Sequence, residues 1–254
     1  MQLTDFITDK NSIIFVLLFA RFSGFFAFMP FFSHANISIN IKTAIALFFT
    51  IFFFPMAKIE FFPQNISMLT LMVLSELMIG FLSGVILNFA FYAISFAGSQ
   101  ISTIMGFSLA NVFDPISGQT SPLISQMLTL FSLLFFLAFD GHHLILLFLS
   151  KSINHIELGS FSPTTHMIKL IIYSVLNMFK MGLILAFPII AISLLADIIF
   201  GMLMKTMPQF NLLVVGFPIK IFLSMAVIIA ILHSLLTIFK NDFMKLFELL
   251  KFFF

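Results

Sequence analysis

The chain has 254 residues, of which 61% are hydrophobic and only 9% are charged. Ordinary soluble domains carry about a quarter of charged residues, so this composition excludes a soluble fold and predicts a protein that crosses a membrane several times. The net charge is only +2 and there is no cysteine, which argues against nucleic-acid partners and removes disulfides and thiolate metal sites.

About six hydrophobic helical segments are expected. The first, 11–32, has the length of a membrane span and carries Arg21 in its middle. A charge at that depth is costly, so it is expected to face a bundle interior or another subunit. The second segment, 43–57, is short for a span exposed to lipid, which favours a helix that is sheltered or partly inserted.

The third apolar segment, 66–112, is too long for one span and too polar at its end for two. Gly80 and Gly84 form a GxxxG pattern, which permits close packing of helices. Glu76 lies one turn before Gly80 on the same face. We expect this carboxylate to hydrogen-bond within the bundle or between subunits, with a proton relay as the alternative.

The segment 98–126 is the one long stretch in which glycine, proline and small polar residues gather. It is either a connecting loop or a polar element placed at membrane depth. A new helix is expected at Ser121–Pro122, because serine followed by proline is typical of a helix start. The residues expected to prevent a continuous helix are Gly98, Gly106, Pro115, Gly118 and Pro122.

Polar, glycine-containing and proline-containing stretches divide the rest of the chain into segments. The sequence FDGHH at 139–143 is expected to interrupt a helix at Gly141, and 151–169 is expected to be the longest loop. An apolar segment follows at 170–195, then two prolines that bracket 208–218, a last span at 221–239 and an interfacial helical tail.

No pattern for catalysis or cofactor binding stands out. There is no phosphate-binding glycine loop and no paired catalytic carboxylates, so an enzyme is the least supported class and no cofactor is expected. No metal site is expected at Asp140, His142 and His143 either, because adjacent histidines point to different faces of a helix and no HExxH spacing is present. The other isolated carboxylates are Glu76, Asp114 and Asp197.

Three blocks carry a family resemblance: GFSLANVFDP (106–115), FDGHHLILLFLS (139–150) and PQFNLLVVGFPIK (208–220). With ELMIGFLSG (76–84) and AISFAG (93–98) before them, they resemble the FliR/SctT/SpaR family of flagellar and type III secretion export-gate subunits. The resemblance covers residues 12–240. Lys205 departs from the arginine that often precedes PQ in the family, and a lysine cannot make a bidentate contact.

The resemblance implies an all-α, non-enzymatic protein of helical hairpins and broken helices in the inner membrane, at the flagellar basal body. It implies FliP-like, FliQ-like and FlhB-like partners, one copy of this subunit per gate, and unfolded flagellar proteins as exported substrates. Residues 1–165 would form a FliP-like part and 166–254 a FliQ-like hairpin and tail, within a single integral membrane domain in contact with lipid.

The resemblance also implies roles for individual residues. The pore plug would be the segment 106–122, with Gly106, Phe107, Ser108, Asn111, Phe113, Asp114, Pro115, Gly118 and Pro122. Polar contacts with partner subunits would come from Arg21, Glu76, Lys180, Asp197, Lys205 and Gln209. Close helix packing is expected at Gly80, Gly84 and Gly98.

Two other functions remain open from the sequence. A secondary transporter would use broken helices around 98–122 and 208–218 to form a site at the membrane midplane. A purely structural membrane anchor would need no mobile segment at all.

Overall fold

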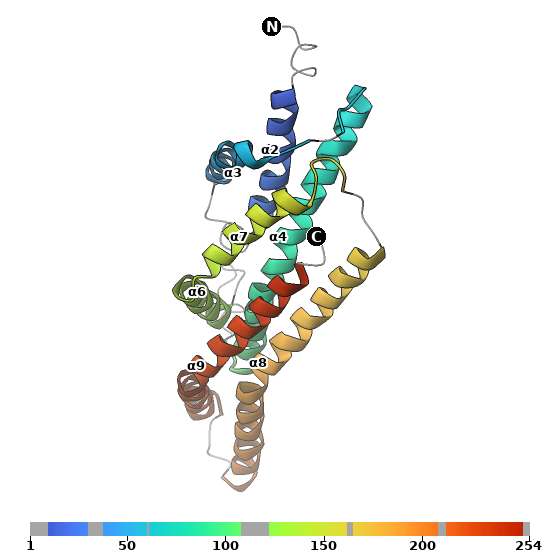
Figure 1. The fold of residues 1–254 in the computed structure, drawn as a ribbon. Helices are drawn as coiled ribbons and strands as arrows, with labels where there is room; N and C mark the ends of the chain where they lie inside the picture. The colour runs from blue at the N-terminus through green and yellow to red at the C-terminus, as the bar shows by residue number, and fades with distance from the viewer. Residues whose placement is uncertain are drawn as a thin grey trace. The chain divides into compact units, whose positions relative to one another are not determined.

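The computed structural model describes residues 10–29, 38–59, 61–107, 122–161, 165–207 and 212–250. Within these ranges every regular element is a helix, which confirms the all-α fold class (Figure 1). The elements are α2 (Lys10–Phe28), α3 (Ile39–Phe53), η1 (Phe54–Met56), α4 (Ile66–Ile104), α6 (Leu123–Ala138), α7 (Gly141–His155), α8 (Thr165–Thr206), η2 (Leu212–Gly216) and α9 (Phe217–Leu249).

Five of the described helices are long and apolar enough to cross a membrane, and α6 with α7 would make a sixth if the two form one broken span. This agrees with the expected six hydrophobic segments. These candidate membrane spans differ in how many of their residues are buried within the chain. In their most apolar stretches, 67% of the residues are buried in α4 and 17% in α3 and α9, so α3 and α9 leave apolar surface for lipid or other proteins.

The extents of several helices differ from the sequence predictions. α4 is one helix of 39 residues that continues through Gly98, so the prediction that Gly98 would break it was wrong. A glycine inside a helix costs about 1 kcal/mol relative to alanine, and close packing at Gly98 offsets that cost. α4 ends just before Gly106, whose φ is +90°.

Further boundaries differ from the prediction. α7 continues to His155 and α8 begins at Thr165, so residues at both ends of the expected loop 151–169 are helical. The expected interfacial tail is not a separate helix, because α9 runs without a break from Phe217 to Leu249. The expected start of a helix after Pro122 is correct, since α6 begins at Leu123.

The chain forms two compact units. Unit 1 contains residues 1–89, 139–174 and 245–254, and unit 2 contains 90–138 and 175–244. The units therefore interleave along the sequence. The separate division into a FliP-like part and a FliQ-like part at residue 165 stays a prediction.

In unit 1, α2 and α4 run parallel at close range because glycines line their contact. A Cβ atom on Gly80 would lie 2.0 Å from the carbonyl oxygen of Arg21, and one on Gly84 would lie 2.8 Å from that of Phe25. From the other side, a Cβ on Gly24 would lie 2.6 Å from the carbonyl oxygen of Leu77. The backbones touch only because these side chains are missing.

Phenylalanines of α2 pack against α3 and α7 in unit 1. Phe22 packs against Phe53 of α3, with ring centroids 5.7 Å apart. Phe25 stacks on Phe148 of α7 at 6.0 Å. α2 is thus the central helix of this unit, in contact with α3, α4 and α7.

In unit 2, α4 and α6 run antiparallel. A Cβ on Gly98 would lie 2.4 Å from the Cα of Ser125, and the hydroxyl of Ser125 donates a hydrogen bond to the carbonyl oxygen of Ser95 at 2.8 Å. Phe91 packs edge-to-face on Phe136, with ring centroids 5.6 Å apart. The contact between Gly98 of α4 and Ser125 of α6 therefore fixes how the two helices are aligned along their length.

The α8–α9 pair in unit 2 is also antiparallel, and polar contacts mark its register. Asn177 donates to Asp242 at 2.7 Å, Ser193 and Ser224 share a hydrogen bond of 2.9 Å, and Lys220 bonds both carboxylate oxygens of Asp197 at 2.7 Å. The residue numbers of the partners fall on one helix as they rise on the other, as two antiparallel helices require.

We expect Gly80→Ala to destabilise the isolated chain and Gly201→Ala to leave it unchanged or slightly more stable. The added methyl group at position 80 meets the backbone of α2, which costs about 1–3 kcal/mol or more. A methyl group at Gly201, which is also helical, has no atom within 4 Å. Thermal unfolding of the chain purified in detergent measures both, and equal melting temperatures for the two variants would contradict the close-packing assignment.

Candidate functional site

The most strongly coordinated polar group of unit 1 is Arg21, in the middle of α2. Its side chain is 1% exposed, and it lies against Glu76 of α4, which is 0% exposed. The guanidinium forms a bidentate pair: Nε donates to Oε2 of Glu76, and Nη2 donates to Oε1 at 3.0 Å. Charges at this depth are tolerated only when paired.

The remaining N–H groups of Arg21 bind the end of α7. Nη1 donates to the carbonyl oxygen of Ser152 at 2.9 Å and to its hydroxyl at 3.1 Å, and Nη2 donates to the carbonyl oxygen of Ile156 at 3.2 Å. All five guanidinium donors are therefore used. A cation among the last carbonyl groups of a helix is also favoured by the helix dipole.

Within the described residues, Glu76 has one further hydrogen-bond partner besides Arg21. Its Oε1 accepts a hydrogen bond of 2.6 Å from the backbone N–H of Gly159. Gly159 has a φ of +81° and packs on Met72, where a Cβ would lie 2.2 Å from the methyl carbon. Only glycine fits both constraints, so the turn after α7 is fixed to α4 by the same carboxylate that holds Arg21.

This cluster is a structural clamp. The sequence predicted either an intrabundle or an intersubunit role for Arg21 and Glu76, and the structure gives both residues partners inside the chain. The two residues are 55 positions apart, so no local pattern in the sequence could have paired them.

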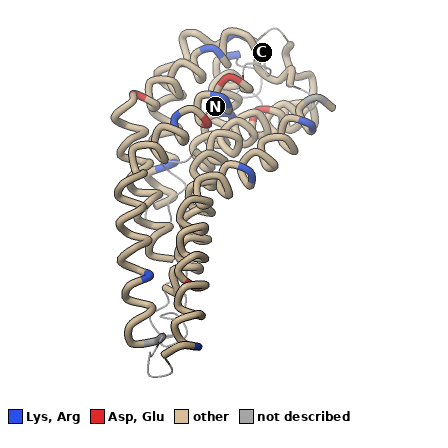
Figure 2. Tube along the Cα trace, turned by 90° about the horizontal axis from the view of Figure 1, so that it is seen from below, with Lys and Arg blue, Asp and Glu red and all other residues tan. Residues whose placement is uncertain are grey.

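The other predicted contact residues lie in unit 2 or outside the described residues. Asp197 pairs with Lys220, and its side chain remains 45% exposed while that of Lys220 is 7% exposed. Lys180 and Lys205 are exposed on α8, and Gln209 lies outside the described ranges. Figure 2 shows that charged residues are sparse along the long helices. These few charged positions therefore lie within helices made mostly of uncharged residues.

The structure describes the two ends of the predicted plug segment. At its start, the N–H of Phe107 bonds the carbonyl oxygen of Ser102 and the N–H of Gly106 bonds that of Thr103, both at 3.1 Å. This pattern is a Schellman motif with Gly106 as its left-handed residue. A Cβ on Gly106 would lie 2.8 Å from the ring of Phe217.

At the other end, Pro122 directly precedes α6. The middle of the segment lies outside the described residues, and with it the predicted plug residues Ser108, Asn111, Phe113, Asp114, Pro115 and Gly118.

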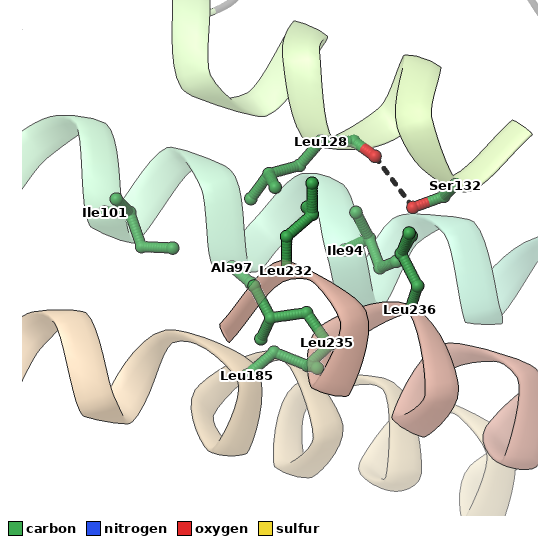
Figure 3. A pocket seen from close by; sticks show the side chains of 9 residues that line it. All are labelled: Ile94, Ala97, Ile101, Leu128, Ser132, Leu185, Leu232, Leu235 and Leu236. Carbon is green, nitrogen blue, oxygen red and sulfur yellow. Dashed lines mark hydrogen bonds between the residues drawn. The ribbon is translucent and has the colours of Figure 1, made fainter. Parts of the chain in front are cut away.

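Unit 2 contains a small cavity lined by residues of α4, α6, α8 and α9. Figure 3 shows it surrounded by nine side chains, of which eight are aliphatic. Its volume is ≈ 10 Å³, about the space of one water molecule. The single hydroxyl there, on Ser132, already donates to the carbonyl oxygen of Leu128 at 2.7 Å. The cavity is too small and too apolar to bind a substrate.

The residues Asp140, His142 and His143 lie closer together than the sequence suggested. One potential ligand atom from each lies within 4.8 Å of the others. The sequence argument placed the helix break at Gly141 and placed the two adjacent histidines on different faces of a helix. Asp140 instead has a φ of +59° and Gly141 is the first residue of α7, so the break falls on the aspartate and not on the glycine.

We expect Arg21→Met to destabilise the chain by about 3–5 kcal/mol, because it leaves Glu76 buried without its counter-ion. The double variant Arg21→Met/Glu76→Gln removes both charges and should recover part of that loss. Lys180→Met, which removes an exposed lysine, is the control and should change stability little. Denaturation of the chain in detergent provides the measurement, and a single variant as stable as the double would refute the clamp.

The model of one family, described as bacterial export proteins, family 1, matches residues 12–246. Flagellar biosynthetic protein FliR of Bacillus subtilis (strain 168) is 33% identical over 242 residues, which cover 92% of this chain and 93% of that protein.

More distant relatives point the same way. FliR of Escherichia coli (strain K12) is 25% identical, with 87% of this chain and 85% of that protein covered. Surface presentation of antigens protein SpaR of Shigella flexneri is 26% identical, with 83% and 82% covered. These matches confirm the resemblance seen in the sequence blocks. Because the family model spans nearly the whole chain, the protein belongs to the bacterial export proteins, family 1.

Proposed function

We propose that the chain is a subunit of the flagellar protein export gate in the bacterial inner membrane. The observation that carries this proposal is the family match over residues 12–246, together with flagellar relatives that align over most of both chains. The five long apolar helices support a multi-pass membrane location. The role is mechanical: the subunit helps to form and to close a path for unfolded flagellar proteins.

We assign the closing element to the segment 106–122. Its described ends support this assignment, because both are anchored in unit 2. The Schellman motif at Gly106 ends α4 firmly, and the contact between Gly98 and Ser125 fixes the start of α6 against α4. Because α4 and α6 pack together and hold both ends of the segment, a change in the position of the segment would leave these two helices folded.

The composition of the segment suits this role. Between Ser108 and Thr120 many residues are small or polar, with one proline, one glycine and one carboxylate, Asp114. Such residues are tolerated at membrane depth only where they face water or protein. A pore lined by partner subunits satisfies that condition, whereas a lipid-facing loop does not.

Partner subunits would cover the apolar surfaces that this chain leaves exposed. On α8 the exposed side chains include Leu176, Phe179, Leu183, Phe187, Leu195 and Ile198. Lys180, Asp197 and Lys205 lie on the same helix, and Gln209 follows it in the sequence. These polar groups offer specific contacts for FliP-like, FliQ-like and FlhB-like proteins within an otherwise apolar interface, because unpaired charge is costly there.

Replacing residues 108–120 by a glycine–serine linker of equal length should leave the gate complex assembled and make it conduct ions. The linker keeps the reach between α4 and α6 and removes the side chains that would close the pore. The measurement is single-channel conductance of the purified complex in a planar bilayer.

The control for this experiment is the wild-type complex, with subunit composition checked by mass for both forms. Conductance that stays at the wild-type level in a fully assembled linker variant would refute the plug assignment. It would not affect the assignment of the chain to the export gate, which depends on the composition of the complex.

The intact complex should contain one copy of this chain with several copies of small FliP-like and FliQ-like membrane proteins. The mass of the complex extracted from native membranes, measured by native mass spectrometry, tests this expectation. A monomer, or a symmetric oligomer of this chain alone, would instead favour a transporter and overturn the gate proposal.

A further inference from the structure

A cluster of metal-binding side chains lies at the start of α7, in unit 1, and the proposed export function does not use it. It consists of Asp140, which directly precedes the helix, and of His142 and His143 in the first turn. One potential ligand atom from each residue lies within 4.8 Å of the other two. The set combines two imidazoles with one carboxylate.

The distances approach those of a metal site. Oδ1 of Asp140 and Nδ1 of His143 are 3.3 Å apart. A tetrahedral zinc ion with ligand bonds of about 2.0–2.1 Å has ligand atoms separated by about 3.3 Å. The centroids of the His142 and His143 rings are 4.2 Å apart, and a ligand atom of His142 lies within 4.8 Å of those of Asp140 and His143.

The backbone of Asp140 is unusual in a way that favours the cluster. It is the one non-glycine residue with positive φ among the described residues. An aspartate before a helix normally caps it by accepting a hydrogen bond from a backbone N–H, but this side chain makes no such cap. Its carboxylate is directed to His143 instead, although the left-handed conformation costs about 1–2 kcal/mol for most residues.

His142 adds an independent observation. Its Nδ1 atom is buried and has no hydrogen-bond partner within the described part of the chain. A buried polar atom without a partner is costly, and such atoms in native structures often mark an ion or a water molecule that completes the site. Asp140 and His143 are 72% and 63% exposed, so an ion from solution can reach the cluster.

We propose that Asp140, His142 and His143 bind one divalent transition-metal ion of the zinc type. Two imidazoles and a carboxylate are the ligand types that zinc accepts, and they suit calcium and magnesium poorly. Water would occupy the fourth position. Binding holds Asp140 in its left-handed conformation and so stabilises the break that precedes α7.

The test uses the full chain, purified in detergent with a tag that contains no histidine and stripped of metal by a chelator. It is titrated with CoCl₂, whose visible absorption reports coordination by protein ligands, and then with ZnCl₂ as a competitor. We expect one Co²⁺ per chain, displaced by Zn²⁺. Zn²⁺ should also raise the melting temperature, because it binds the folded chain preferentially.

His143→Ala and Asp140→Asn should each weaken metal binding by about tenfold or more, and both should reduce the thermal shift at a given Zn²⁺ concentration. Asparagine also accepts positive φ, so Asp140→Asn preserves the turn. His155→Ala, an exposed histidine of the same helix, is the matched control and should bind metal as the wild type does.

Two results would overturn the site. One is absence of metal binding to the wild-type chain. The other is binding that His143→Ala and Asp140→Asn leave unchanged, or that His155→Ala weakens equally. Melting temperatures without metal show that each variant is folded, so that a loss of binding reports the ligands and not the fold.

Discussion

The bidentate pair between Arg21 and Glu76 is the interaction on which unit 1 depends. Two opposite charges are buried almost completely among apolar helices, where neither would be stable alone. The geometry leaves no donor of the guanidinium unused. Together these hydrogen bonds join α2, α4, the end of α7 and the turn at Gly159, which hold one another in place.

The glycines make this clamp possible. Gly80 lies one turn after Glu76, and the backbone of α2 at Arg21 fits into the space that its missing side chain leaves. A larger residue at position 80 would move α2 away from α4 and lengthen the bonds of the guanidinium. The ion pair therefore forms only when α2 and α4 pack as closely as the glycine at position 80 allows.

The contacts of unit 2 are of two kinds. Small residues and hydroxyl groups meet at Gly98 with Ser125 and at Ser193 with Ser224, and the pairs Asn177–Asp242 and Lys220–Asp197 join α8 to α9. A hydroxyl costs much less to bury than a charge when it is hydrogen-bonded. The outward faces of α8 and α9 remain apolar, which suits helices surrounded by lipid or by partner subunits in the proposed gate.

The sequence by itself determined the membrane class, the all-helical fold and the family. These properties depend on composition and on local blocks such as FDGHH, and such features need no knowledge of contacts. The helix starting after Pro122 was predictable for the same reason, because proline acts on its own turn.

Only the tertiary structure decided which residues meet. Arg21 and Glu76 were both recognised as costly charges, but nothing local identifies a partner 55 residues away. Gly98 lies inside a helix because packing against Ser125 outweighs its weak helix propensity. Asp140, His142 and His143 converge because one aspartate takes a left-handed conformation, which helical periodicity cannot anticipate. In each case either contacts between distant residues or the conformation of one residue decides the outcome. The local pattern of residues determines neither of them.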